Sequence, residues 1–192
     1  RSMTLRPEGT AAVVRAFVEN KLYAEVIQPV KVYYMAPMFR YERPQAGRFR
    51  QHRQFGVEVF GVGSPSIDAE VISIAYHLYD ALGIEQLVVK VNSLGDKESR
   101  DNYRTALVDY LLPLKDTLCN DCQERINTNP LRVLDCKIDS FDNPPKMSEY
   151  RSIEAKDYFE KVCEYLDVIS IPYEIDEKLV RGLDYYDHTV FE

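Results

Sequence analysis

The sequence predicts an α+β fold in which an antiparallel sheet is flanked by helices and interrupted by an α-rich insertion. Two extended runs around a polar turn, at residues 39–61, predict a long β-hairpin. Further strand patterns at 87–91 and 171–175 enclose residues 93–170, where helical periodicity dominates. Neither GxxxxGKS/T nor GxGxxG occurs, so the usual nucleotide-binding loops between a strand and a helix are not indicated.

Composition narrows the class of protein. The 192 residues are 45% apolar, enough for a hydrophobic core, and no apolar run approaches the roughly 20 residues that span a bilayer. A formal net charge of −7 argues against a protein that binds nucleic acid by counterion release alone. Residues 40–53 nevertheless hold five arginines and one acid, Glu42, which suits a small phosphate-bearing ligand; a solvated hairpin tip is the alternative.

The N-terminal stretch predicts a turn followed by a helix. Thr10 can cap this helix, whose apolar positions recur at helical spacing at Val13, Val14, Phe17 and Val18. Glu8 lies just ahead, near the positive end of the helix dipole. Two interpretations stay open: Glu8 compensates charge at the helix start, or Glu8 and Thr10 together bind an ammonium group.

The hairpin carries the densest set of polar side chains. Strand alternation puts Arg40 and Glu42 on one face of the first strand, and Gln54, Gly56 and Glu58 on one face of the second. Because a half-buried strand usually turns its polar side to water, we expect this face to be the open one. Gly56 would leave a gap between its neighbours through which a ligand could approach the backbone.

Three further helices follow. Ser64 and Asp96 are typical N-caps of helices that end near Gly83 and Leu112, and a third helix covers about 153–167. Residues 113–150, rich in proline and polar side chains, are expected to be irregular. The expected buried positions of the three helices are Val71, Ile74, Ala75, Leu78 and Leu82; Tyr103, Ala106, Leu107, Tyr110 and Leu111; and Phe159, Val162, Cys163 and Leu166.

The cysteines leave two possibilities. Cys119-x-x-Cys122 could begin a zinc site, and a zinc-binding interaction module would then contain stoichiometric metal. Because no second closely spaced pair of cysteines accompanies it, reduced thiols in a cytoplasmic protein are the simpler interpretation, and we expect no metal site.

The C-terminal stretch, residues 179–192, combines charged and aromatic residues without amphipathic periodicity. Arg181 and Gly182 precede the adjacent tyrosines Tyr185 and Tyr186. Two adjacent strand residues point to opposite faces, so at most one of these tyrosines is buried in the same layer.

Four motifs in this order resemble the histidyl-tRNA synthetases of bacterial type, a family of class II aminoacyl-tRNA synthetases. The hairpin, from FRYER to QFGVE, is similar to class II motif 2 in its histidine-specific form. Residues 4–11, TLRPEGTA, resemble the family's loop for the amino-acid α-amino group. Residues 179–192 are similar to its histidine-specific signature, and residues 119–137 to its insertion domain.

The resemblance implies that L-histidine and ATP, with Mg²⁺, form histidyl-adenylate, from which tRNA(His) is charged. Arg40 and Arg181 would be catalytic, holding the α-phosphate from opposite sides. Arg40, Glu42 and Arg48 would bind ATP. The family pattern assigns the histidine site to Glu8, Gly9, Thr10, Gln54, Glu58, Arg181, Tyr185 and Tyr186.

The family pattern also sets expectations for domain organisation. Residues 1–92 and 171–192 would be two parts of the catalytic core, and 93–170 the insertion. Motif 1, which builds the homodimer interface, would precede this stretch; motif 3 and the anticodon-binding domain would follow it. We therefore expect a cytoplasmic, homodimeric parent protein and a fragment that is inactive or severely impaired alone.

Two features weigh on the assignment. Where the family pattern leads us to expect an aromatic residue and then His or Asn, the chain has His52 and Arg53, so the strand packing beside Gln54 is open. The main alternative is a non-catalytic paralogue such as the regulatory subunit of ATP phosphoribosyltransferase. Retention of Arg40, Gln54, Glu58 and Arg181 favours the enzyme.

Overall fold

The computed structural model describes residues 3–41, 43–180 and 186–192, and it has the predicted α+β composition. The chain divides into two compact units, Arg1–Gly63 and Ser64–Glu192. The division into core, insertion and core at 93 and 171 concerns the domains of the whole protein and stays a prediction.

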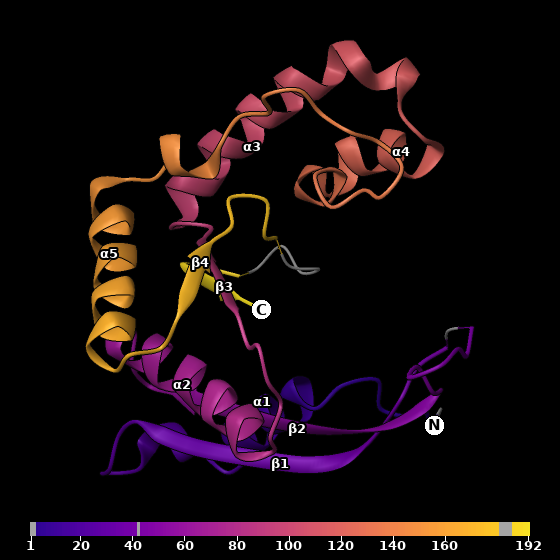
Figure 1. Ribbon diagram of the computed structural model, residues 1–192. Helices are drawn as coiled ribbons and strands as arrows, with labels where there is room; N and C mark the ends of the chain where they lie inside the picture. Colours follow the sequence, from indigo (N-terminus) through magenta and orange to yellow (C-terminus); the bar gives the residue numbers. More distant parts are fainter. Residues whose placement is uncertain (1–2, 42, 181–185) are drawn as a thin grey trace. The chain divides into compact units, whose positions relative to one another are not determined.

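The first unit is built on the predicted hairpin. Strands β1 (Val30–Phe39) and β2 (Gln51–Phe60) pair antiparallel along their whole length, as the long paired ribbon in Figure 1 shows. At the tip, Gln45 and Arg48 exchange backbone hydrogen bonds of 3.1 and 2.9 Å around Gly47, whose φ of 75° favours glycine.

Helix α1 (Thr10–Glu19) covers one face of the hairpin, and a 3₁₀ turn, η1 (Leu22–Ala24), follows it. The rings of Phe17 and Phe60 stack with their centroids 4.4 Å apart. The covered face is the one that carries Gln54 and Glu58, so the expectation that this polar face is the open one is wrong. The side chains of the opposite face, including Tyr33 (76% exposed) and Phe55 (43%), point away from α1.

The second unit contains a three-stranded sheet in the order β4 (Tyr173–Ile175), β3 (Val89–Ser93), β5 (Thr189–Phe191). The predicted strand near 87–91 is central, as expected. It pairs antiparallel with β5 but parallel with β4, so this sheet is mixed rather than antiparallel. Helices α2 (Pro65–Ala81) and α5 (Ile153–Val168) pack with β3 around one hydrophobic core.

The ends of α2 follow the sequence prediction, but its buried stripe does not. Ser64 Oγ accepts a hydrogen bond from the Ser66 backbone N–H, and Gly83 has a φ of 73° just beyond the helix. The buried positions are Ala69 and Ile72, whereas Leu82 of the predicted stripe is 67% exposed. Apolar residues surround this helix on several sides, so periodicity alone did not identify the side that packs against α5.

Helix α3 (Lys97–Leu111) starts after the predicted cap, Asp96, whose carboxylate accepts a 2.8 Å bond from the Ser99 N–H. The segment that we expected to be irregular contains helix α4 (Asn120–Thr128), which the prediction missed. It also contains the short 3₁₀ segments η2 (Leu112–Thr117), η3 (Pro130–Val133) and η4 (Met147–Glu149). A second hydrophobic core lies among these helical segments. Its buried residues are Tyr103, Leu107, Leu111, Leu118, Cys122, Ile126, Val133 and Met147.

Among the residues that the structure describes, no helix combines the length and apolar character needed to cross a membrane.

Candidate functional site

The turn before α1 brings Glu8 and Thr10 into different roles. Both carboxylate oxygens of Glu8 accept from the Ala11 backbone N–H at 3.1 Å, so Glu8 satisfies the helix start. The Thr10 side chain makes no capping bond, contrary to prediction; instead, its hydroxyl donates to Glu58 Oε1 at 2.6 Å. Thr10 thus links the N-terminal turn to strand β2.

Tyr34 fills the gap that we expected at Gly56. The two residues are direct partners in the β1–β2 register. A Cβ placed on Gly56 would meet Cε1 of the Tyr34 ring at 2.5 Å, and one on the buried Gly9 would meet Cδ2 at 2.9 Å. The ring therefore lies between two glycine backbones, and both glycines are needed because of the ring, not because of an open approach to the backbone.

The groups around the Tyr34 hydroxyl form an acceptor-rich cluster. Burial raises the pKa of Tyr34, as do the nearby carboxylates of Glu58 and Glu8, while a hydrogen bond with Thr10 acts in the opposite direction. Two carboxylates, a hydroxyl and a phenol in one place suit a ligand with N–H donors, such as an ammonium or an imidazole.

Gln54 lies on the same face of β2 as Gly56 and Glu58, and is half-buried. Its strand partner is the small residue Ala36, so no bulky side chain stands directly opposite. The first unit therefore places the predicted histidine-binding residues of this region on one half-covered surface, namely Glu8, Gly9, Thr10, Gln54 and Glu58.

Two of the predicted ATP-binding residues lie toward the hairpin tip. Arg40 follows the last β1 residue, and its backbone N–H donates to the Arg50 carbonyl at 2.8 Å. Its side-chain Nε lies 3.4 Å from His52 Nδ1. His52, which departs from the family pattern, therefore contacts a predicted catalytic arginine. Arg48 is exposed in the turn.

Only some of the site residues predicted near the C-terminus are among the described residues of the second unit. Arg181 and Tyr185 lie outside the described residues, as does Glu42 in the first unit. Tyr186 is 36% exposed, and its carbonyl accepts from Arg100 Nη1 at 2.7 Å. Arg100 also forms an ion pair with Asp187. Sequence reasoning missed Arg100, since nothing in its helical context distinguishes it.

Asn92 anchors the chain at Leu179, before residues 181–185. It is buried in β3, and its side-chain amide donates to the Leu179 carbonyl at 3.1 Å. Arg151 in turn donates to Asn92 Oδ1 at 2.7 Å. The sequence carries no clear signal for this role, because Lys90 and Ser93 of the same strand are polar too. Asn92 and Arg100 therefore anchor residues that precede and follow 181–185.

Comparisons with known proteins agree on one family. A family model described as histidyl-tRNA synthetase matches residues 1–95. A histidine–tRNA ligase of Anoxybacillus flavithermus is 56% identical over the whole chain, which spans 46% of that protein. The crystal structure of the apo histidyl-tRNA synthetase of Staphylococcus aureus is 46% identical and superposes with a TM-score of 0.81, covering all of this chain and 45% of that one.

A more distant match concerns the fold alone. A structure of an ATP phosphoribosyl transferase complex from Thermotoga maritima is 15% identical, with a TM-score of 0.53, and the match covers 98% of this chain and 70% of that one. The chain spans about half the length of the Anoxybacillus and Staphylococcus proteins, which it matches at 56% and 46% identity.

Proposed function

Because the chain belongs to the histidyl-tRNA synthetase family, we propose that the protein containing it activates L-histidine with ATP and charges tRNA(His). The observation that carries this proposal is the acceptor cluster around Tyr34, in which the Thr10 hydroxyl bonds Glu58 at 2.6 Å. Histidine offers an ammonium group and an imidazole N–H, both of which need acceptors. A half-buried pair of carboxylates supplies them at a lower local dielectric than water.

In this proposal, the histidine ligands divide by chemistry. Glu8, Thr10 and Gln54 take the α-ammonium group, with the Gly9 backbone beside it. Glu58 accepts a hydrogen bond from the imidazole, and Tyr185 and Tyr186 complete recognition of the ring. The Tyr34 ring sets the spacing between the turn and β2, so it positions these groups.

The arginines act on the phosphates. The histidine carboxylate attacks the α-phosphorus of ATP, which is supplied as its magnesium complex; the bond to the bridging oxygen breaks and pyrophosphate leaves. Arg40 neutralises charge that develops on the α-phosphate, and Arg181 does so from the opposite side. His52 restricts the Arg40 guanidinium. Because arginine forks match phosphate oxygens, these two residues are suited to that role.

The remaining ATP contacts and the second step follow the family pattern. Glu42 contacts the adenine end and Arg48 the γ-phosphate. In the second step, a hydroxyl at the 3′ end of tRNA(His) attacks the adenylate carbonyl and AMP leaves. The parent protein would be a cytoplasmic homodimer, and this stretch alone would be inactive or severely impaired.

Histidine-dependent exchange of pyrophosphate into ATP by the full gene product tests the proposal. Exchange that requires histidine, and that other amino acids do not support, is expected. A folded, full-length protein without exchange would instead favour the non-catalytic paralogue of the ATP phosphoribosyltransferase type. The 56% identity to a histidine–tRNA ligase, against 15% for the transferase complex, favours the synthetase.

A further inference from the structure

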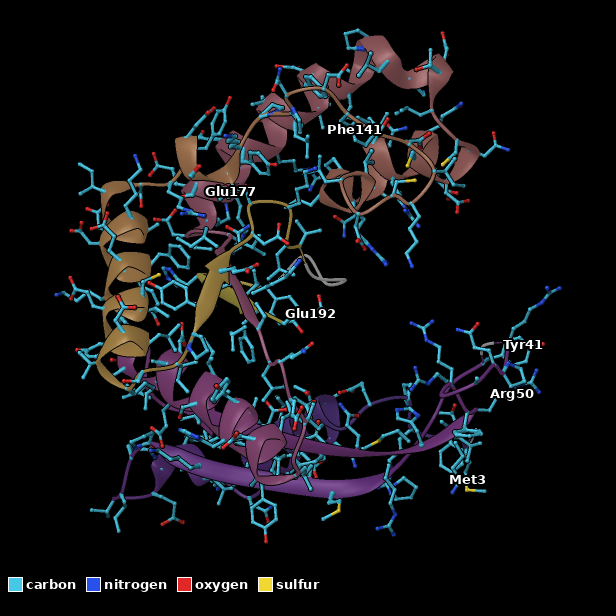
Figure 2. All side chains as sticks on the ribbon, viewed as in Figure 1. Met3, Tyr41, Arg50, Phe141, Glu177 and Glu192 are labelled. Carbon is cyan, nitrogen blue, oxygen red and sulfur yellow. The ribbon has the colours of Figure 1, made fainter. Side chains whose placement is uncertain are left out.

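Four side chains of the helical segment converge on one point that the proposed function does not use. The ligand atoms of Cys119, Cys122, Cys136 and Asp139 all lie within 4.8 Å of one another. Sulfur atoms gather beside the ribbon of α4, as Figure 2 shows. All four cysteines of the chain are free thiols, so no disulfide accounts for the cluster.

The four residues form two pairs with the same spacing. Cys119 is the N-cap of α4 and Cys122 lies in the first turn, while Cys136 and Asp139 follow η3. Among the cysteines and histidines alone there is no second closely spaced pair. Cys136-x-x-Asp139 is that pair, because a carboxylate oxygen is also a zinc ligand.

The distances fit a tetrahedral ion. Zinc bonds of about 2.3 Å to sulfur and about 2.1 Å to oxygen imply S···S separations of about 3.8 Å and S···O separations of about 3.6 Å. The Sγ atoms of Cys119 and Cys136 are 3.9 Å apart, and Cys136 Sγ is 3.5 Å from Asp139 Oδ2. The longest separation in the set, 4.8 Å, would need to contract by about 1 Å to fit the same geometry.

The surroundings of the cluster favour anionic ligands. The backbone N–H groups of Ile138 and Asp139 both donate to Cys136 Sγ at 3.4 Å. The Cys119 N–H donates to the Asp139 carboxylate at 3.2 Å, which orients the fourth ligand.

We propose that Cys119, Cys122, Cys136 and Asp139 bind one zinc ion. Three thiolates and a carboxylate in tetrahedral arrangement select zinc over the hard cations Mg²⁺ and Ca²⁺. Four protein ligands leave no open position, so the ion is structural rather than catalytic. It ties the start of α4, a helix of nine residues, to the segment after η3. So short a helix has little stability of its own.

The metal content of the full gene product, purified with a reductant and without chelator, tests this site. About one zinc per chain is expected by elemental mass spectrometry. Cys122→Ser and Cys136→Ser should lose it. Cys163→Ser is the matched control, because Cys163 lies on α5 and packs against the core formed by α2, α5 and β3, so this variant should keep its zinc.

A measurement on the unmodified protein covers variants that fail to fold. A chelator should lower the melting temperature, and one equivalent of Zn²⁺, but not Mg²⁺, should restore it. Co²⁺ in place of zinc should give the visible bands of a tetrahedral thiolate complex, and Asp139→Asn should weaken its binding. A reduced, folded protein that takes up neither Zn²⁺ nor Co²⁺ would overturn the site. So would a Cys122→Ser variant that retains full zinc content, or a metal-free native protein with a Cys119–Cys136 disulfide. None of these readouts depends on aminoacylation.

Discussion

Gly56→Ala tests the central feature of the candidate site, the Tyr34 ring between two glycines. The new methyl group would meet Tyr34 Cε1 at 2.5 Å, well inside van der Waals contact. The ring cannot simply slide away, because its other edge lies against the backbone of Gly9. A Cβ added to Gly9 would lie only 2.9 Å from Tyr34 Cδ2. The substitution must therefore displace the ring or the strand.

The expected cost is that of overpacking, about 1–3 kcal/mol of the free energy of unfolding. In a chain of this size, each kcal/mol lowers the melting temperature by roughly 2–4 °C. Circular dichroism during thermal and urea unfolding would measure it. Gly63→Ala is the matched control: no heavy atom lies within 4 Å of its added Cβ, so its stability should be unchanged or slightly increased.

A double-mutant cycle identifies the ring as the cause. Tyr34→Ala removes the atoms with which the methyl group collides, so Gly56→Ala should cost little in that background. The coupling energy should therefore nearly equal the cost of Gly56→Ala alone. If Gly56→Ala is as harmless as Gly63→Ala, or is equally costly with and without the Tyr34 ring, the packing argument is refuted.

Three further predictions concern the proposed ligands and one helix cap. Glu58→Gln should weaken histidine binding by about 1–3 kcal/mol, roughly 5- to 150-fold in calorimetric Kd, because a charged acceptor is lost; the exposed Glu25→Gln is its control, and an unchanged Kd would contradict the imidazole assignment. Arg181→Ala should slow pyrophosphate exchange far more than it weakens histidine binding, since its charge acts on the transition state, and an unaltered exchange rate would exclude that role. The pKa of Asp96 is lowered to about 2, chiefly by the hydrogen bond from Ser152, so the folded state binds this proton more weakly than the unfolded state. The stability that this shift contributes should be complete above about pH 4 and lost as the pH falls toward 2. Asp96→Ala should lower the free energy of unfolding by about 1–2 kcal/mol at neutral pH. It should also remove this part of the acid dependence of stability, as measured by urea unfolding.

The features predicted correctly from the sequence depend on local chemistry. Ser64 and Asp96 cap helices because their side chains reach backbone N–H groups two or three residues ahead. Gly83 marks a helix end because its φ of 73° strains other residues. The buried face of α5, with Phe159 and Val162, follows from 3.6-residue periodicity. Each of these needs only a few neighbouring residues.

The features that were missed depend on contacts between distant residues. Tyr34 meets Gly56 only through the strand register, and the sequence gives no reason to prefer Tyr34 over the adjacent Tyr33. Asp139 joins the cysteine cluster only because the chain after η3 returns to the start of α4. The spacing Cys136-x-x-Asp139 can be read from the sequence, but one aspartate among many acidic residues does not by itself indicate a zinc ligand.

The covered polar face of the hairpin explains why a reliable rule failed at the candidate site. Polar strand residues face water when water is their best partner. Here the turn before α1 supplies other partners: Thr10 reaches Glu58, and the carboxylate of Glu8 acts on the same phenol of Tyr34. A binding site for an amine needs its acceptors partly withdrawn from water, because solvent would weaken each charged hydrogen bond. In the described part of the hairpin, the open face is therefore the one with Tyr33 and Phe55, and the polar face is the one that we propose binds the ligand.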